Sequence, residues 1–244
     1  KTISSNDVEI TWIKDNVGDH LMPLNLFKDI PQRLIDSLGI NDGIPSSMSA
    51  FLVKRDSIQI LFDTGKGNPD SRLIPNLKSL GVDPDDIQYI YLTHFHGDHI
   101  GGMMHGDTVV FPHAEIYASK VEYEAWMAMP DQNKDMVRKT MSAYKEHLHL
   151  FEFNDTLPGH VVALNAVGHT PGHTVFEVGD FLIVGDLVHG AALQIADPDI
   201  CASYDMNPKS AVMTRHHFLE YARTHHLVMA GMHLPVPAFW SWNK

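Results

Sequence analysis

The chain contains the sequence THFHGDHIGG at residues 93–102, directly after an apolar run with the composition of a buried strand. Four side chains that can bind a metal ion lie close together there: His94, His96, Asp98 and His99. At the end of a strand, His94 and His96 point the same way because side chains alternate with a period of two. In the turn that follows, Asp98 and His99 can fold back toward a second point. The spacing therefore predicts a metal site rather than a group of surface or core histidines.

Three further candidates follow later predicted strands, each beside a glycine that lets the backbone turn tightly. The complete predicted ligand set is His94, His96 and His169 for one metal, Asp98, His99 and His233 for the other, and Asp186 as a bridge. Each metal then lacks one ligand, which a shared hydroxide fills, as in hydrolytic metal pairs roughly 3.5 to 4 Å apart. Imidazole and carboxylate ligands favour two divalent transition ions, first Zn²⁺ and then Mn²⁺, Fe²⁺ or Co²⁺, over Mg²⁺ or Ca²⁺.

The sequence around these motifs alternates between strand and helix patterns. Predicted strands lie at residues 8–13, 50–53, 58–62, 87–92, 161–164, 175–178, 181–184 and 227–230, and predicted helices at residues 31–38, 71–80, 120–129, 134–147 and 208–224. Strands occur in both halves of the chain with helices beside them, which is typical of an α/β (α+β) fold with two sheets packed face to face and helices outside. No linker-like stretch divides the chain, so we expect a single domain over residues 1–244.

Composition narrows the classes of partner. The chain has 18 basic and 30 acidic side chains, and its net charge of -12 argues against nucleic acid or an anionic membrane surface. No apolar run approaches the roughly 20 residues that a membrane-spanning helix needs. Cys201 is the only cysteine, which rules out an internal disulfide. The first residue is Lys1 and no leader pattern follows it, so we expect a cytoplasmic protein, or an exported one if a leader has been removed.

The motifs resemble those of the metallo-β-lactamase superfamily, whose signature is a His-x-His-x-Asp-His run followed by three later ligands. The resemblance is greatest to its methyl parathion hydrolase-like and acyl-homoserine-lactonase-like branches. It rests on DTG at 63–65, THFHGDHIGG at 93–102, GHTPGHT at 168–174 and GDLVH at 185–189, while residues 191–198 and 233–235 favour the parathion hydrolase side. The resemblance implies an αββα sandwich of two mixed sheets with a dinuclear metal centre at one edge.

In function, the resemblance implies a metal-dependent hydrolase that cleaves lactones, carboxylic esters or organophosphate triesters with a metal-bridging hydroxide. True β-lactamases generally lack a carboxylate at the position of Asp186, and Cys201 lies outside every motif. Lactonases place a tyrosine three residues after the bridging aspartate, whereas this chain has His189. The hydrolytic centre thus matches the family, and the substrate contact beside it differs from the lactonase pattern.

Two residues are candidates for catalysis beyond metal binding. The Asp98 carboxylate is placed to touch the attacking hydroxide and to pass its proton to the leaving oxygen. His189 follows the bridging ligand closely, so we expect it either to donate a hydrogen bond to the oxyanion or leaving group, or to pack beside the ligands.

Other residues near the motifs have expected supporting roles. Phe95 and Trp126 are candidates for the substrate pocket. We expect Asp63 to hydrogen-bond a ligand imidazole rather than to bind metal, and His173 to be structural. The aromatic residues at 239–242 are candidates for covering a packed surface or for a homodimer contact.

Three alternatives to an ester-type hydrolase remain open from the sequence. They are an iron-dependent redox enzyme of the same fold, a metallo-β-lactamase, and a metal-sequestering or structural protein. Metal content separates the first from a hydrolase, because iron with oxygen consumption indicates redox chemistry. The expected partner is a small ester, lactone or phosphotriester, and a nuclease is disfavoured by the net charge.

Overall fold

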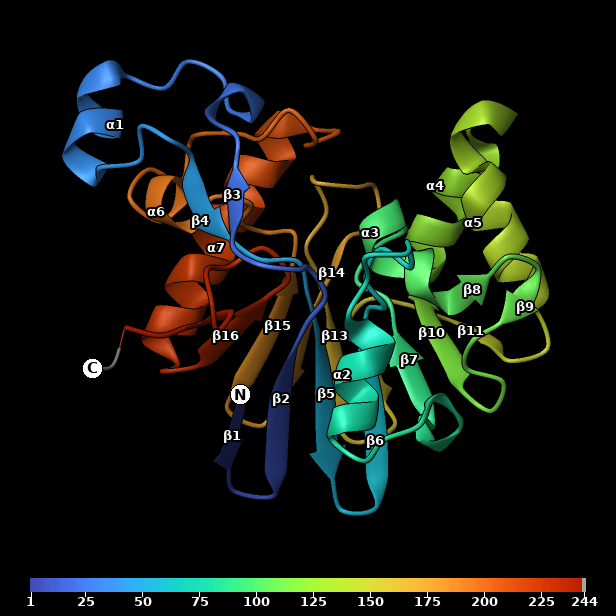
Figure 1. Ribbon diagram of the computed structural model, residues 1–244. Helices are drawn as coiled ribbons and strands as arrows, with labels where there is room; N and C mark the ends of the chain where they lie inside the picture. Colours follow the sequence, from blue (N-terminus) through green and yellow to red (C-terminus); the bar gives the residue numbers. More distant parts are fainter. Residues whose placement is uncertain (243–244) are drawn as a thin grey trace.

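The structure is a computed structural model that describes residues 1–242, leaving out the side chains of residues 131–133. A seven-stranded sheet forms one half of the molecule (Figure 1). Its strands are, in spatial order, β1 (Thr2–Ser5), β2 (Val8–Lys14), β5 (Ser49–Arg55), β6 (Ile58–Phe62), β7 (Tyr89–Tyr91), β10 (Glu115–Ser119) and β11 (Leu148–Phe151). Neighbouring strands are antiparallel from β1 to β6 and parallel from β6 to β11, so the sheet is mixed.

A six-stranded sheet forms the other half. Its strands are, in spatial order, β12 (Thr156–Leu157), β13 (Val161–Asn165), β14 (Thr174–Val178), β15 (Phe181–Gly185), β16 (Val228–Gly231) and β17 (Phe239–Trp240). Only β15 and β16 pair in parallel among these neighbours. The parallel pair matters for the site, because both strands end at the same edge of the sheet.

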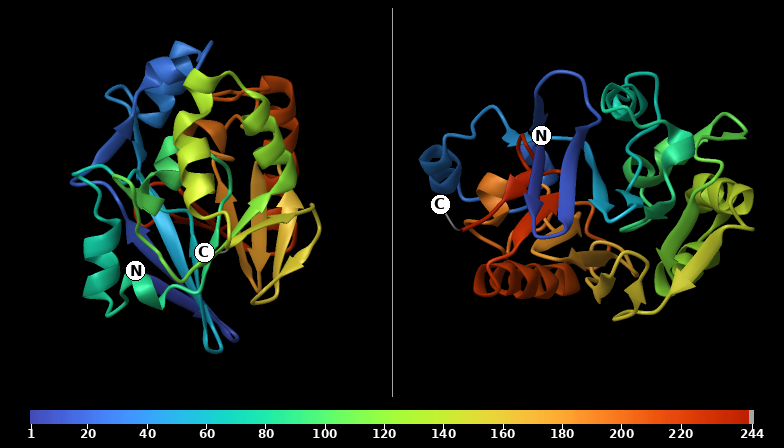
Figure 2. Two further views of the ribbon diagram at one scale, coloured as in Figure 1. Left: turned by 90° about the vertical axis from the view of Figure 1, so that its right-hand side faces the viewer. Right: turned by 90° about the horizontal axis from the view of Figure 1, so that it is seen from below.

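The two sheets pack face to face, with helices on the outside (Figure 2). Alternate residues of β5 enter two different cores, because side chains point to opposite faces of a strand. Phe51 and Val53 pack against the second sheet, whereas Ala50 and Leu52 pack under helices. The outer helices are α2 (Leu73–Ser79), α4 (Lys120–Ala128) and α5 (Asp131–Ala143) on the first sheet and α7 (Pro208–Thr224) on the second. The predicted αββα architecture is confirmed.

Two of these helices begin at residues whose side chains cap the helix N-terminus. The Ser119 side chain accepts a hydrogen bond from the backbone N–H of Glu122 at the start of α4, at 3.4 Å. Asn207 caps α7 by accepting from Ser210 N–H at 3.1 Å, and Pro208 occupies the first helical position. Both arrangements satisfy amide groups that a helix leaves unpaired at its N-terminus.

A smaller layer covers one end of the sandwich. It contains the hairpin of β3 (His20–Met22) and β4 (Ile44–Ser46), the 3₁₀ turn at Leu24–Leu26, α1 (Gln32–Leu38) and α6 (Ala191–Gln194). These elements share a separate apolar cluster that includes Phe27, Ile44 and Leu193. At the same end lie α3 (Gly97–Ile100), a 3₁₀ turn at Gly101–Met103, and the hairpin of β8 (Met104–His105) and β9 (Thr108–Val109) (Figure 1). The covering layer thus faces the loops that carry the predicted ligands.

The predicted elements differ from the structure mainly at their ends. The helix expected at 134–147 is α5, which ends at Ala143 because Tyr144 leaves helical geometry. The Tyr144 hydroxyl donates to the Met103 carbonyl oxygen at 2.9 Å. The sequence patterns also did not predict β1, β10 and β11 in the first sheet or β12 and β17 in the second, all of which are short strands at or near a sheet edge.

The aromatic residues near the C-terminus pack on their own sheet. β17 pairs with β16, and the Phe239 ring lies 5.6 Å from the Phe51 ring. This placement covers the inner core at the sheet edge, and the homodimer stays a prediction. Within residues 1–242, no helix has the length and apolar character needed to span a bilayer.

Candidate metal centre

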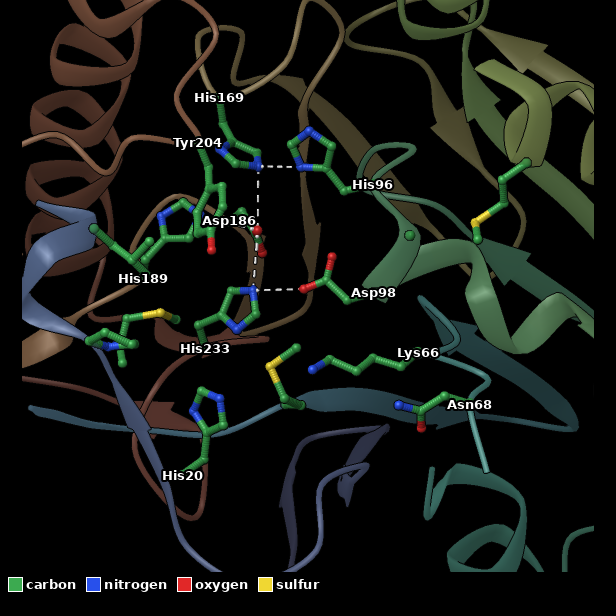
Figure 3. Close-up of a pocket in the computed structure, with 16 residues that line it drawn as sticks. His20, Lys66, Asn68, His96, Asp98, His169, Asp186, His189, Tyr204 and His233 are labelled. Atoms are coloured by element: carbon green, nitrogen blue, oxygen red, sulfur yellow. Dashed lines mark hydrogen bonds and ion pairs between the residues drawn. The ribbon is translucent and has the colours of Figure 1, made fainter. Parts of the chain in front are cut away.

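Seven side chains from separate loops converge at the covered end of the sandwich. Figure 3 shows those that also line the cleft: His96, Asp98, His169, Asp186 and His233. The seven follow four strands: His94, His96, Asp98 and His99 come after β7, His169 lies between β13 and β14, Asp186 follows β15, and His233 follows β16. Neighbouring parallel strands end at one edge, which explains why Asp186 and His233 meet. The structure therefore brings together all of the side chains predicted as ligands.

The first group consists of three imidazoles and one carboxylate. The Nδ1 atom of His96 lies 3.1 Å from Nε2 of His94 and 2.9 Å from Nε2 of His169. The Asp186 Oδ2 atom lies 3.3 Å from Nε2 of His169 and 3.7 Å from Nε2 of His94. These atoms face one point, as the ligands of a tetrahedral transition-metal site do.

The second group shares Asp186 with the first. The Nε2 atom of His99 lies 3.1 Å from Asp186 Oδ1, and the Nε2 atom of His233 lies 3.2 Å from Asp186 Oδ2. Asp98 completes the group, with its Oδ2 atom 3.4 Å from His233 Nε2 and its Oδ1 atom 3.8 Å from His99 Nε2. A carboxylate common to both groups is the geometry that a bridging ligand requires.

The chemistry of these groups fits divalent metal ions. Buried polar atoms are normally hydrogen-bonded, yet His99 Nε2 and Asp186 Oδ1, although 3.1 Å apart, form no hydrogen bond with each other or with another described residue. Both atoms point into the cluster rather than toward solvent, because His99 and Asp186 are almost fully buried. Imidazole nitrogens and carboxylate oxygens are ligands of zinc and related ions, so the arrangement supports metal binding.

Burial and the two carboxylates divide the imidazoles into two classes. Burial lowers the pKa of His94 well below its ordinary value and that of His169 to about 3, so both rings stay neutral with a lone pair available. For His233, burial is outweighed by the Asp186 and Asp98 carboxylates, which raise its pKa to about 10. Metal binding at His233 therefore competes with a proton.

A cleft of about 710 Å³ opens above the two groups. Its apolar lining comes partly from the covering layer, with Met22, Pro23 and Leu26, and partly from Met48 and Met136. A polar wall lies below the ligands in Figure 3 and carries His20, Lys66 and Asn68. The cleft has the size of a pocket for a small organic molecule.

His189 lies between the cleft and the ligands. Its Nε2 atom is 3.2 Å from Asp186 Oδ2, and its ring stacks on that of His233 with centroids 5.4 Å apart. Both ring nitrogens are buried without a hydrogen-bond partner among the described residues. His189 is among the residues that line the cleft, so its ring lies beside the region where a ligand would sit.

Two residues predicted for the substrate pocket lie elsewhere. Phe95 is 1% exposed and packs in the core beneath the helices of the first sheet. Its side chain points away from the cleft because it alternates with those of His94 and His96. Trp126 also belongs to this core, although its ring contacts His96 edge-on at 5.8 Å. The prediction that they line the pocket is wrong.

Comparison with known proteins agrees with this geometry. Residues 44–230 match the metallo-beta-lactamase superfamily. The chain belongs to the metallo-beta-lactamase superfamily. The match includes His94, His96, Asp98, His99, His169 and Asp186, and ends shortly before His233.

Relatives within the superfamily include lactonases. The lactamase-like protein aptB of Emericella nidulans is 30% identical over 188 residues, which are 71% of this chain and 51% of that protein. The N-acyl homoserine lactonase AiiA of Bacillus thuringiensis subsp. kurstaki is 32% identical over 109 residues, 44% of this chain and 39% of that protein. The matches thus span about half, or less, of these curated relatives' length.

Two solved structures of the superfamily are similar over nearly the whole chain. The hydrolase AbOPH has a TM-score of 0.88 and 29% identity, with 98% of this chain and 91% of that chain covered. AidC, a dizinc quorum-quenching lactonase in complex with a product N-hexnoyl-L-homoserine, has a TM-score of 0.89 and 27% identity, with 98% and 92% covered. The chain therefore has the metallo-beta-lactamase fold and is related to lactonases.

Hydrogen bonds from outside the ligand set orient several of the imidazoles in this superfamily member. Asp63 accepts from His99 Nδ1 at 2.7 Å and from the Thr93 hydroxyl at 2.7 Å, which confirms the expected role of Asp63. His173 is structural, as predicted: its Nδ1 donates to the Ala166 carbonyl oxygen and its Nε2 accepts from the Asp186 backbone N–H, both at 3.0 Å. These contacts fix the ring and backbone directions at the cluster.

A buried ion pair behind His169 was not predicted from the sequence. The Asp205 Oδ1 atom lies 3.1 Å from His169 Nδ1, and its Oδ2 atom accepts from the Arg215 guanidinium at 3.0 Å. Arg215 is 1% exposed and also donates to the carbonyl oxygens of Leu187 and Pro198, both at 2.8 Å. Asp205 lies in an irregular segment, and Arg215 is one of several polar residues in a predicted helix. No local sequence pattern therefore indicates that the two form a buried ion pair.

Glu122 was also missed, and it joins the two loops that carry the first ligand group. Its Oε1 atom accepts from Phe95 N–H at 3.0 Å and from Trp126 Nε1 at 2.7 Å. Its Oε2 atom accepts from the Thr170 hydroxyl at 2.9 Å and from Gly172 N–H at 2.7 Å. Phe95 lies between His94 and His96, and Thr170 follows His169, so one buried carboxylate sets the distance between these ligands.

We expect Glu122→Gln to weaken metal binding by about tenfold. All four partners of Glu122 are donors, two at each oxygen, so a glutamine NH₂ group would face two donors and leave at least one of them unpaired. The affinity can be measured by competition with a chromophoric chelator. Glu124→Gln is the matched control, because it removes the same charge from an exposed position of the same helix. Equal affinities in the two variants would contradict the positioning role.

Proposed function

We propose that this protein is a dinuclear metal-dependent hydrolase that cleaves an ester-type bond in a lactone, a carboxylic ester or an organophosphate triester. The observation that carries the proposal is the shared carboxylate of Asp186, which faces His99 on one side and His169 on the other. A pair of sites joined in this way, at the base of a cleft, is the arrangement of hydrolytic metal pairs. The dizinc lactonase among the structural relatives supports the proposal.

The chain's residues would hold two divalent ions, most favourably Zn²⁺. His94, His96 and His169 would hold the first, Asp98, His99 and His233 the second, and Asp186 both. Bound there, the ions supply hydroxide at neutral pH and polarise the carbonyl or phosphoryl oxygen of the substrate. The protein's contribution is to keep seven ligands in place through Asp63, Glu122, His173 and Asp205, and to exclude bulk water with the covering layer.

Asp98 is the residue best placed to move a proton. Its side chain is 27% exposed, whereas that of Asp186 is 3% exposed, so one face of the Asp98 carboxylate remains open to the cleft. The His99 and His233 rings outweigh the effect of burial and hold the pKa of Asp98 well below its ordinary value. An ionised carboxylate at the cleft can accept the proton of the attacking water and return it to the leaving oxygen.

His189 is proposed to donate a hydrogen bond to the substrate oxygen that gains negative charge. The buried, unpartnered ring nitrogens beside Asp186 support this role. A donor that is already oriented before the reaction stabilises the charged transition state without further reorganisation. The position corresponds to that of the tyrosine in the lactonase pattern, and histidine offers the same kind of donor.

We expect His189→Phe to lower kcat by about a hundredfold with little change in KM, because it removes a donor used in the transition state. His189→Gln keeps a donor and is expected to recover part of the loss. Both are measured with the same ester on protein of verified metal content. A change in KM alone would indicate a packing role instead.

The proposed function is tested by a hydrolysis panel on metal-loaded protein. The substrates are an N-acyl homoserine lactone, an aryl carboxylic ester, a methyl parathion-like triester and a β-lactam. We expect turnover of at least one of the first three, loss of that turnover after chelation, and recovery on adding Zn²⁺ or Mn²⁺. Turnover of the β-lactam alone, or bound iron with oxygen consumption and no hydrolysis, would overturn the proposal.

A further inference from the structure

The polar wall of the cleft, formed by His20, Lys66 and Asn68, carries groups that the proposed chemistry does not use. Lys66 extends into the cleft below the ligands (Figure 3). Lys66 and Asn68 are both exposed to solvent, and among the described side chains the Lys66 ammonium group has no ion pair and the Asn68 amide has no hydrogen bond. The Nδ1 atom of His20 is buried and has no hydrogen-bond partner among residues 1–242. Polar groups gathered in this way are available to a ligand.

The loop that presents Lys66 is tightly held. The buried carboxylate of Asp15 accepts from Lys66 N–H at 2.9 Å and from Arg72 N–H at 3.0 Å. Gly67 has a φ of 63°, and a Cβ atom added to it would lie 2.0 Å from the Gly101 carbonyl oxygen. The backbone at Lys66 is therefore packed directly against the segment that follows the first metal motif. The packing fixes the Cα position of Lys66 relative to the side chains of the metal centre. The Lys66 side chain itself can still extend toward a small molecule bound in the cleft.

Charge at the cleft is distributed unevenly. Lys66 is the only lysine or arginine among the described residues that line it. The carboxylates that line it, Asp98 and Asp186, already face the imidazoles of the metal centre. The remaining lining is largely apolar and includes Met22, Leu26 and Met48. A ligand that matches this surface has an apolar chain and one negative charge.

We propose that Lys66 recognises a carboxylate carried by the substrate away from the bond that is cleaved. The preferred substrates are then ester-type compounds whose apolar chain ends in a carboxylate, an inference that rests on the proposed hydrolytic function. A single ammonium group suits a singly charged carboxylate. Phosphate groups are more often bound by several donors or by the bidentate guanidinium of arginine, which the described lining lacks.

The test compares para-nitrophenyl hexanoate with the mono-para-nitrophenyl ester of hexanedioic acid on metal-loaded protein. The measured quantity is the ratio of kcat/KM for the anionic ester to that for the neutral one. We expect Lys66→Met to lower this ratio by about tenfold and Lys66→Glu to lower it further. Added salt should lower the ratio in the unmodified protein, because the contact is partly open to solvent.

Lys78→Met is the matched control, since Lys78 is an exposed lysine of α2 outside the cleft. It changes the net charge by the same amount as Lys66→Met and is expected to leave the ratio unchanged. If Lys66→Met and Lys78→Met give the same ratio, Lys66 does not recognise the carboxylate, and the proposed hydrolytic function is unaffected.

A binding measurement separates this inference from the proposed function. Dicarboxylates from butanedioate to octanedioate are titrated calorimetrically into the metal-loaded protein, beside the monocarboxylates of equal length. We expect one length of dicarboxylate to bind about tenfold more tightly than its monocarboxylate, and Lys66→Met to abolish the difference. If this difference appears while no ester is hydrolysed, the anion site stands and the hydrolytic proposal fails. If no dicarboxylate is preferred at any length, the anion site is overturned.

Discussion

Asp186→Ala is expected to abolish hydrolysis of every substrate together, by on the order of a thousandfold or more. The reason is geometric: Asp186 Oδ1 faces His99 at 3.1 Å, and Asp186 Oδ2 faces His169 at 3.3 Å and His233 at 3.2 Å. Without this carboxylate, no side chain is common to the two ligand groups. His96→Ala is expected to have the same effect, because it removes a ligand from the first group.

The Asp186→Ala measurement needs both kinetics and metal content. The ratio kcat/KM is determined for each active member of the substrate panel, and bound metal is measured by elemental analysis. Asp180→Ala is a suitable control, because Asp180 is an exposed residue in the turn at the other end of β15. Turnover retained by Asp186→Ala with both metals still bound would contradict the shared-carboxylate mechanism.

Asp205→Ala is expected to lower the free energy of unfolding by about 3–5 kcal/mol. Arg215 is fully buried beside Asp205, and the substitution leaves its guanidinium charge with carbonyl oxygens alone as partners. The same change removes the hydrogen-bond partner of His169 Nδ1, which is expected to weaken metal binding by about 10- to 100-fold. Urea unfolding of the metal-free protein and chelator competition measure the two effects separately.

A double variant distinguishes the structural role of Asp205 from its role at the metal centre. Asp205→Ala combined with Arg215→Met removes both charges and leaves an apolar side chain in the buried site. We expect it to recover much of the lost stability, because replacing a buried ion pair with apolar groups is often close to neutral. Metal affinity should stay low, since His169 still lacks its partner. Recovery of both properties together would show that Asp205 acts only on folding.

The ligand set could be read from the sequence because metal binding depends on residue type and local spacing. His94, His96, Asp98 and His99 lie within six positions of one another just after β7, so their nearness in sequence already brings them together in space. The alternation of side chains along the chain should have placed Phe95 on the opposite face from His94 and His96, inside the core. The pocket assignment of Phe95 was wrong because it relied on nearness in sequence instead of direction.

Of the residues that support the ligands, Asp63 was predicted from the sequence, whereas Glu122, Asp205 and Arg215 were not. Glu122 bonds Thr170 across 48 positions, and Asp205 and Arg215 reach His169 from an irregular segment and a helix. Neither contact leaves a periodic or local pattern, because each depends on how distant segments pack. The walls of the cleft have the same origin, since Lys66 lies in the loop after β6 and Met22 in strand β3, and the two come to the same cleft only after folding.

The sequence by itself determined the fold class and which side chains meet at the candidate metal centre. Hydrophobic periodicity and the metal-binding chemistry of side chains are local properties, so they can be recognised in the sequence before the fold is known. Only the tertiary structure decided that Glu122 and Asp205 also hold those ligands in place and which side chains form the cleft. Such contacts are made by segments brought together in the two-sheet packing, and the distances between them exist only in the folded chain.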